Sequence, residues 1–308
     1  MAFCGQSEIY RTTLQAIPST GNIFHWMNAN NISWRVYSDG LPFFVLYPDL
    51  IPTEVFSGRF KSYKNLLTDL QAGDAPQVII VEPFYEDAPH IGSQHPNCNH
   101  PPLSIGWGEE FLRQTYIAAT INPDIWAETL MVVYYDEHGG FADHVPPPAM
   151  DNRFNVNPPT PANSPSNNFA SLGPRIPAIL VSPFVKPGSV CHDLFDHTSV
   201  LQYLAELFTP GVPYSDAVNF RSQQANAINS ISAALEDNAA HIPPPPPPMQ
   251  SLTVQTVLGS QVNTAPDGAM GQAFEQAAQQ LIVNYPDEVN AKYPELNNWK
   301  AGLNLARP

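Results

Sequence analysis

The sequence predicts an α/β fold with a largely parallel sheet flanked by helices. One observation is a series of short apolar runs rich in β-branched residues, such as QVIIV and LMVVYY. Another is that segments with helical spacing of apolar residues separate these runs. A third is that proline, glycine or acidic residues close the runs, which is typical of buried parallel strands.

The amino-terminal third contains a helix and a strand in succession. The segment NIFHWMNANN (22–31) has the pattern of a short helix, and ISWRVY (32–37) has the pattern of a strand. The next apolar run, PFFVLYP (42–48), is compatible with either a strand or a loop.

Two further elements follow before the first acidic strand end. One apolar stripe at helical spacing predicts a helix that stops at Gly73, and it consists of Phe60, Tyr63, Leu66, Leu67 and Leu70. The run QVIIVEP (77–83) predicts a buried strand that proline closes.

The second half repeats this alternation. Apolar residues on one face predict a helix over 111–119, and Leu130 to Tyr135 and Ile176 to Ser182 predict strands. The segment FDHTSVLQYLAELF (195–208) predicts an amphipathic helix with Asp196 at its N-cap.

Proline-rich segments suggest the domain organisation. Residues 1–236 are expected to form the main α/β portion of the chain, and 237–251 a stiff linker around the six prolines of 243–248. Residues 252–308 are expected to be a tail with one helix, at 273–285. The stretch 157–169 is rich in proline and asparagine and predicts a loop.

Composition excludes some functions. Only 13% of residues are charged, and the formal net charge is −15, so binding to nucleic-acid phosphates is not expected. The three cysteines form no CxxC pair, so neither a disulfide framework nor a zinc knuckle is expected. No run is long enough to predict a transmembrane helix, and no secretory signal is visible.

Because charge is scarce, acids at the ends of apolar runs are informative. Glu82 follows QVIIV, and Asp136 and Glu137 follow LMVVYY. Ligand sites in open α/β sheets lie beyond the carboxyl ends of the strands. Gly139 and Gly140 would allow the chain to turn so that both carboxylates reach one divalent metal ion. The alternative is an ordinary loop with solvated acids.

Several histidines are candidates for phosphate contact or proton transfer. His138 adjoins the two acids, and the pair Asp143-His144 fits either a functional or a plain loop. His197 begins a helix, where it could face an anion or belong to the cap formed by Asp196 and Thr198. Prolines follow His100 and fix its backbone, whereas His90 and His95 are expected to be ordinary loop residues.

The sequence contains no convincing nucleophile. It lacks a GxSxG elbow, and no serine or threonine has a base and an orienting acid at a recognisable spacing.

Three segments in order, YYDEHGGFADHVPPP, LGPRIPAILVSPFVKPG and FDHTSVLQYL, resemble the bacterial and fungal phosphoesterase family. That family includes phosphatidylcholine-type phospholipases C and acid phosphatases. The segments IFHWMNANNISWRVY and QVIIVEP, with a later HPP, are similar to its upstream units. The resemblance covers residues 20–210, and it implies that 1–236 are the carboxyl-terminal portion of the family's phosphoesterase catalytic domain.

The resemblance implies an alkaline-phosphatase-like fold and hydrolysis of a phosphoester with a divalent metal ion of unknown identity. It implies that Asp136 and Glu137 are the metal-binding pair and that His100 contacts the phosphoryl group. His138, His144, Asp196 and His197 lie in the family's motifs, and we expect Glu82 and Asp196 to contact the substrate. The substrate would be a phospholipid or a small phosphoester.

Family members carry a further motif near their amino terminus, of the type ENRSFD, which supplies metal ligands and precedes the nucleophile. No such motif precedes Tyr10 here, so we expect that the first strand or strands, two metal ligands and the nucleophile are missing. The same absence would account for the lack of an export signal, because family members are commonly exported. The alternatives to an enzyme are therefore a catalytically inactive relative that binds a metal or an anion, and a structural fragment.

Overall fold

The computed structural model describes residues 21–51, 53–89, 95–101, 103–150, 171–236, 243 and 269–299. These residues form two compact units. Unit 1 contains the described residues of 21–33 and 123–243, and unit 2 contains those of 34–122 and 269–299. A small parallel sheet with surrounding helices confirms the α/β class.

The sheet of unit 2 is parallel, as predicted. Its strands are β1 (Trp34–Ser38), β2 (Phe60–Ser62) and β3 (Val78–Glu82), in the order β2-β1-β3. The central strand β1 is the most deeply buried, with Val36 and Tyr37 inaccessible to solvent. Ser38 pairs with Glu82, so β1 and β3 end together at one edge of the sheet.

Two predictions in this unit need correction. The run 42–48 forms neither a strand nor an irregular loop but two 3-10 helices, η1 (Phe43–Leu46) and η2 (Pro48–Leu50). The stripe that begins at Phe60 is not one helix, because it passes through β2, η3 (Tyr63–Asn65) and α2 (Leu66–Gln71). The apolar residues of this stripe therefore belong to three different elements that pack against the same core.

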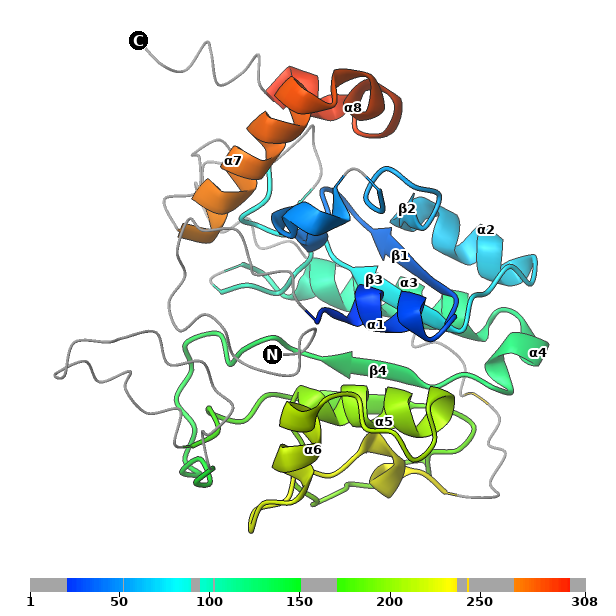
Figure 1. Cartoon of the computed structure of the whole chain (residues 1–308), viewed down its shortest axis with the longest axis vertical. Helices are drawn as coiled ribbons and strands as arrows, with labels where there is room; N and C mark the ends of the chain where they lie inside the picture. Colours follow the sequence, from blue (N-terminus) through cyan, green and yellow to red (C-terminus); the bar gives the residue numbers. More distant parts are fainter. Residues whose placement is uncertain are drawn as a thin grey trace, which may run out of the picture. The chain divides into compact units, whose positions relative to one another are not determined.

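The remaining helices of unit 2 are α3 (Gly106–Thr120), α7 (Ala269–Asn284) and α8 (Pro286–Lys292). Helix α3 packs against α2, and α7 packs against η1 and α8 (Figure 1). The prediction of a single helix within 252–308 was incomplete, because α8 follows α7 after Tyr285 alone. The expected linker 237–251 and loop 157–169 lie outside the described residues, apart from Pro243.

Unit 1 has its own two-stranded sheet, formed by β4 (Met131–Tyr134) and β5 (Ala178–Val181). These strands are antiparallel, with Met131 opposite Val181 and Tyr134 opposite Ala178. The predicted parallel arrangement therefore does not extend to this pair. Both strands are half-buried or exposed rather than fully buried, contrary to what their apolar sequences indicate.

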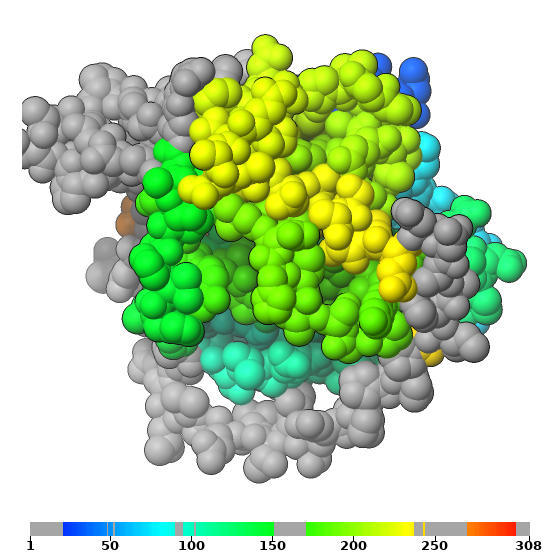
Figure 2. Space-filling model, turned by 90° about the horizontal axis from the view of Figure 1, so that it is seen from below, coloured from blue at the N-terminus to red at the C-terminus, as the bar shows by residue number. Residues whose placement is uncertain are grey.

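The other elements of unit 1 are α1 (Ile23–Ala29), α4 (Pro123–Trp126), α5 (Thr198–Phe208), α6 (Asp216–Ser222) and η4 (Ile231–Ala234). Helix α5 buries Leu201, Leu204 and Ala205, while Leu207 at its end is 52% exposed. Figure 2 shows the face where the segments from α5 to η4 form one closely packed surface.

No helix in the part of the chain that the structure describes is long and apolar enough to cross a membrane.

Candidate functional site

The segment after β4 is the candidate site, and it starts with two exposed carboxylates. Asp136 and Glu137 both lie on the surface, directly after Tyr135. Asp136 Oδ1 accepts a hydrogen bond of 3.0 Å from the Glu137 backbone N–H, and Glu137 Oε2 accepts one of 2.7 Å from the Gly139 N–H. The turn thus holds each carboxylate by one oxygen, and within the described residues no hydrogen bond engages the other oxygen of either.

Glycines permit this turn. Gly139 and Gly140 have φ angles of 66° and 75°, in the left-handed region that side chains with a Cβ rarely occupy. The backbone reverses here, and the Phe141 N–H donates to the His138 carbonyl oxygen at 3.2 Å. The glycines therefore permit the turn, and the predicted approach of both carboxylates to one metal ion stays a prediction.

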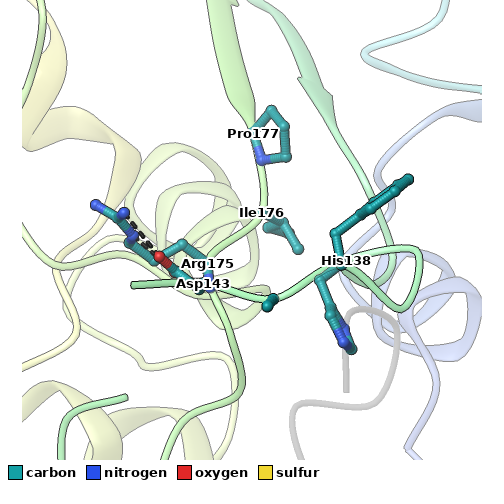
Figure 3. Close-up of a pocket in the computed structure, with 7 residues that line it drawn as sticks. His138, Asp143, Arg175, Ile176 and Pro177 are labelled. Atoms are coloured by element: carbon teal, nitrogen blue, oxygen red, sulfur yellow. Dashed lines mark hydrogen bonds and ion pairs between the residues drawn. The ribbon is translucent and has the colours of Figure 1, made fainter. Parts of the chain in front are cut away.

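The turn borders an open hollow of about 400 Å³. Its lining residues come from the turn and from the segment that leads into β5, and they are His138, Phe141, Ala142, Asp143, Arg175, Ile176 and Pro177. Figure 3 shows His138 on one side of the hollow and the Asp143–Arg175 pair on the other. His138 Nδ1 lies 3.5 Å from Glu137 Oε2, so the imidazole and a carboxylate adjoin at its rim.

Asp143 and Arg175 form a two-pronged ion pair across the base of the turn. Asp143 Oδ2 accepts from Arg175 Nε at 2.8 Å, and Oδ1 accepts from Nη2 at 2.9 Å. Backbone N–H groups of Arg175 and Val145 donate to the same carboxylate, both at 3.1 Å. Hydrogen bonds from the Arg175 guanidinium, together with these amides, hold the pKa of Asp143 far below its usual range.

This pair ties the turn to the segment before β5. Tyr134 lies opposite Ala178 in the antiparallel register, so the chain after β4 and the chain before β5 leave the sheet side by side. Arg175 lies three residues before β5, and its ion pair with Asp143 connects the chain before β5 to the chain after β4. His144, by contrast, has a 90% exposed side chain and lies 3.7 Å from Asp143 Oδ1.

His197 is attached to the end of β4. Its Nε2–H donates to the Tyr135 carbonyl oxygen at 3.0 Å, and its ring meets the Tyr134 ring edge-on at 5.5 Å. Burial, together with the nearby Asp136 carboxylate, raises the pKa of Tyr134 to about 12. The histidine therefore fixes the backbone that presents Asp136, which is a positioning contact.

Asp196 occupies a buried ion pair at the start of α5. Its Oδ2 accepts from Arg221 Nε at 2.9 Å and from Nη2 of the same guanidinium, and both side chains are less than 10% exposed. Its Oδ1 accepts from the backbone N–H and the hydroxyl of Thr198, at 2.7 and 2.6 Å. The predicted N-cap position of Asp196 is wrong by one residue, because His197 occupies it, and the Asp196 carboxylate instead accepts from Thr198, the first residue of the helix. Substrate contact by Asp196 stays a prediction, and its four donors favour a structural role.

Glu82, in unit 2, has the opposite environment to Asp136. Its side chain is 4% exposed, and Oε1 accepts from the Phe43 backbone N–H at 3.2 Å and the Tyr85 hydroxyl at 3.1 Å. Burial raises the pKa of Glu82 to about 8, so the carboxyl is mostly protonated at neutral pH. Its predicted contact with substrate stays a prediction, and the folded chain does not present this group to solvent.

His100, also in unit 2, has a half-exposed side chain whose Nδ1 lies 3.2 Å from Glu86 Oε2. A neighbouring histidine, His95, stacks on Trp107 with ring centroids 4.9 Å apart. The predicted phosphoryl contact of His100 is not tested by this geometry, and it stays a prediction.

The described residues do not complete a metal site. Among them, no three His, Cys, Asp or Glu side chains gather closely enough to hold an ion. Asp136 and Glu137 offer oxygen ligands of the kind that hard cations take, but two carboxylates in one turn form at most part of such a site.

Sequence reasoning missed Arg175 and Arg221. The chain has only 13 lysines and arginines, so the low content of charged residues that made the acids informative also makes these two arginines informative. Arg175 lies within the quoted segment LGPRIPAIL, and Arg221 lies 25 residues after its partner Asp196, a pairing that no local pattern reveals.

Comparison with known proteins gives a family and several relatives. Residues 4–212 match the Phosphoesterase family. The chain is 24% identical to the non-specific phospholipase C6 of Arabidopsis thaliana over 299 residues, which are 94% of the chain and 54% of that protein. It is 36% identical to the non-hemolytic phospholipase C of Burkholderia pseudomallei over 153 residues, 46% of the chain and 20% of that protein.

A third relative is the non-hemolytic phospholipase C of Pseudomonas aeruginosa, 31% identical over 210 residues, 59% of the chain and 29% of that protein. The chain thus spans about half or less of the length of these relatives. The family match covers both the β3 segment with Glu82 and the β4 turn with Asp136 and Glu137. With more than half of its residues matched, the chain belongs to the Phosphoesterase family.

Proposed function

We propose that the chain hydrolyses a phosphoester at the turn that follows β4, with a phospholipid as the substrate class and an alkaline-phosphatase-like arrangement of the whole protein. The observation that carries the proposal is that His138, which directly follows the exposed carboxylates Asp136 and Glu137, lines an open hollow together with Arg175. The family match and the phospholipase C relatives support the reaction class.

Cleavage of a phosphoester breaks a P–O bond and leaves charge on the departing oxygen, which must take up a proton. His138 is the histidine that lines the hollow, and its Nδ1 lies 3.5 Å from Glu137 Oε2. We assign the proton donation to His138. His197 and the Asp143–Arg175 pair would hold the turn in place, and His144 would remain a solvent-exposed neighbour.

Asp136 and Glu137 remain the candidates for binding a divalent cation, whose role in such reactions is to offset charge on the phosphoryl oxygens. The described residues by themselves do not complete a site for this cation. The nucleophile is likewise unassigned among the described residues.

The substrate class can be tested with chromogenic esters and the full chain. We expect slow hydrolysis of p-nitrophenyl phosphorylcholine, faster than that of p-nitrophenyl phosphate, and none of p-nitrophenyl acetate above the buffer rate. Parallel assays with Mn²⁺, Zn²⁺ and Ca²⁺ show which cation, if any, raises the rate. Equal rates on all three esters, or no phosphoester hydrolysis under any of these conditions, would contradict the proposal.

A second candidate function is a non-catalytic relative that binds a metal or an anion. The two exposed carboxylates Asp136 and Glu137 favour it, because each keeps one oxygen outside the turn's backbone hydrogen bonds while no nucleophile is assigned among the described residues. Calorimetry with Mn²⁺ distinguishes the two functions. Binding without turnover, weakened in Asp136→Asn and unchanged in the exposed control Glu128→Gln, would support the binding protein.

A further inference from the structure

Among the residues that the structure describes, the buried acid Glu82 has no cationic partner. It ends β3, and only one of its two oxygens is hydrogen-bonded. Within the described ranges, the other oxygen, Oε2, has no hydrogen-bond partner and Glu82 forms no ion pair. A buried carboxylate in such a place is costly, whereas a neutral carboxyl is tolerated.

The two donors to Glu82 are also the residues that α7 covers. The Phe274 ring of α7 lies 6.4 Å from the ring of Phe43 and 5.9 Å from the ring of Tyr85. These two rings are themselves 6.3 Å apart. Phe274 therefore packs on both residues that donate to Glu82, so we expect the burial of Glu82 to depend on the packing of α7.

The helices α7 and α8 are docked along their length. The buried face consists of Phe274, Ala278, Leu281, Ile282, Val289 and Tyr293. At the end of α8, Lys292 Nζ donates to the carbonyl oxygens of Val55 and Ser57, at 2.7 and 2.6 Å. The ring of Phe56, which lies between Val55 and Ser57 in the sequence, has its centroid 5.5 Å from that of the Tyr285 ring. Figure 1 shows α7 and α8 in this unit.

We propose that α7 and α8 form a pH-sensitive latch on unit 2, which the neutral form of Glu82 keeps closed and its ionised form loosens. The latch sits over the edge where β1 and β3 end together, which is the edge where open α/β sheets place their ligands. Opening would therefore uncover a carboxylate and aromatic side chains at that edge.

The direction of the pH effect follows from the proton that Glu82 holds when the latch is closed. Burial raises its pKa from 4.5 to about 8, and opening returns the group to water. Closing takes up a proton between these two values, so the closing equilibrium should fall about tenfold for each pH unit across this window. Below pH 4.5 and above pH 8 this group contributes no further pH dependence.

Lys292 has the opposite effect on the closing equilibrium, in a separate pH range. Burial lowers its pKa from 10.5 to about 8, so closing releases a proton between these values and becomes more favourable as pH rises. The latch is therefore weakest near pH 8. The other titratable groups that face this region are Tyr85, which donates to Glu82, and Tyr293, whose pKa burial and the charges of Glu82 and Glu295 raise. Measurements below pH 9.5 avoid ionisation of Tyr293 in the open state, because its ordinary pKa is 10.0.

Hydrogen exchange of the full chain, read by mass spectrometry from pH 5 to 9.5, tests the proposal. After correction for the intrinsic exchange rate, peptides from 270–296 should lose protection toward pH 8 and regain it above. In Glu82→Gln, protection should no longer fall as the pH rises toward 8. In Lys292→Met, protection should no longer rise above pH 8. In the exposed control Glu288→Gln, protection should still fall toward pH 8 and rise again above it.

Protection that does not change with pH in the wild-type chain would overturn the proposal without any variant. A loss below pH 8 that persists in Glu82→Gln would overturn the assignment to Glu82. Because the readout is not activity, the result is independent of the proposed phosphoester hydrolysis.

Discussion

Two strands of this chain end in acid, yet the two ends have opposite chemistry. At the end of β3, Glu82 is covered and mostly neutral at pH 7, while at the end of β4, Asp136 and Glu137 are exposed. The sequence pattern is the same, an apolar run followed by a carboxylate. What differs is what covers each end, since aromatic rings from η1 and α7 surround the first and a glycine turn opens the second to solvent. An acid at a strand end is thus a candidate for a site only when its surroundings let it stay charged.

Asp196 is a third case, an acid that is buried and also paired. Replacing it with alanine leaves the Arg221 guanidinium buried without a partner, which should lower the free energy of unfolding of unit 1 by about 3–5 kcal/mol. Urea unfolding of Asp196→Ala beside the exposed control Asp216→Asn measures this. A loss no larger than that of the control would show that the pair contributes nothing to stability.

Glu82 should show the reverse effect. Glutamine resembles the neutral carboxyl, so the side chain of Glu82→Gln does not have to take up a proton when the chain folds at pH 7. The gap between pH 7 and the ordinary pKa of 4.5, at about 1.4 kcal/mol per unit, predicts a stabilisation of about 3 kcal/mol.

This stabilisation should vanish below pH 4.5, because the raised pKa of Glu82 stabilises the fold there and this benefit is lost as pH rises toward 8. Thermal or urea unfolding at pH 4.5 and 7 gives the two values. Equal differences at both pH values would indicate that Glu82 is ionised in the folded chain.

A smaller, local effect is expected at the Asp143–Arg175 pair. Arg175→Met removes the donors that hold Asp143, so the backbone amides of Val145 and Gly139 should exchange faster with solvent water. Asp143→Asn should have a similar effect, and the double variant should add little, since both remove one interaction. Fully additive changes would mean that the two residues act on the turn separately.

Much of the local structure was predictable. The apolar runs that became β1, β3, β4 and β5 were recognised, as were α1, α3, α5 and α7. The β2 segment was missed because Phe60 shares helical spacing with residues of η3 and α2. The antiparallel course of β5 could not be read from its sequence, because an apolar strand has the same pattern in either direction.

The candidate site was predictable to a similar degree. Short motifs located Asp136, Glu137 and His138, because those residues are adjacent in sequence. The burial of Glu82 was not predictable, since it depends on Phe274, which lies 192 positions further along the chain. The same holds for the Asp196–Arg221 and Asp143–Arg175 pairs, which join residues 25 and 32 positions apart.

The contrast between the two strand ends is tested most directly by one activity measurement, the rate of p-nitrophenyl phosphorylcholine hydrolysis by Asp136→Asn and Glu82→Gln relative to the wild-type chain. Loss of a carboxylate at the reacting centre should reduce the rate of Asp136→Asn at least tenfold, about 1.4 kcal/mol or more of transition-state stabilisation. Glu82→Gln, which keeps the neutral form of a buried group, should remain within about twofold of wild type. The opposite pattern, with activity lost in Glu82→Gln and retained in Asp136→Asn, would contradict the assignment of the site to the turn after β4.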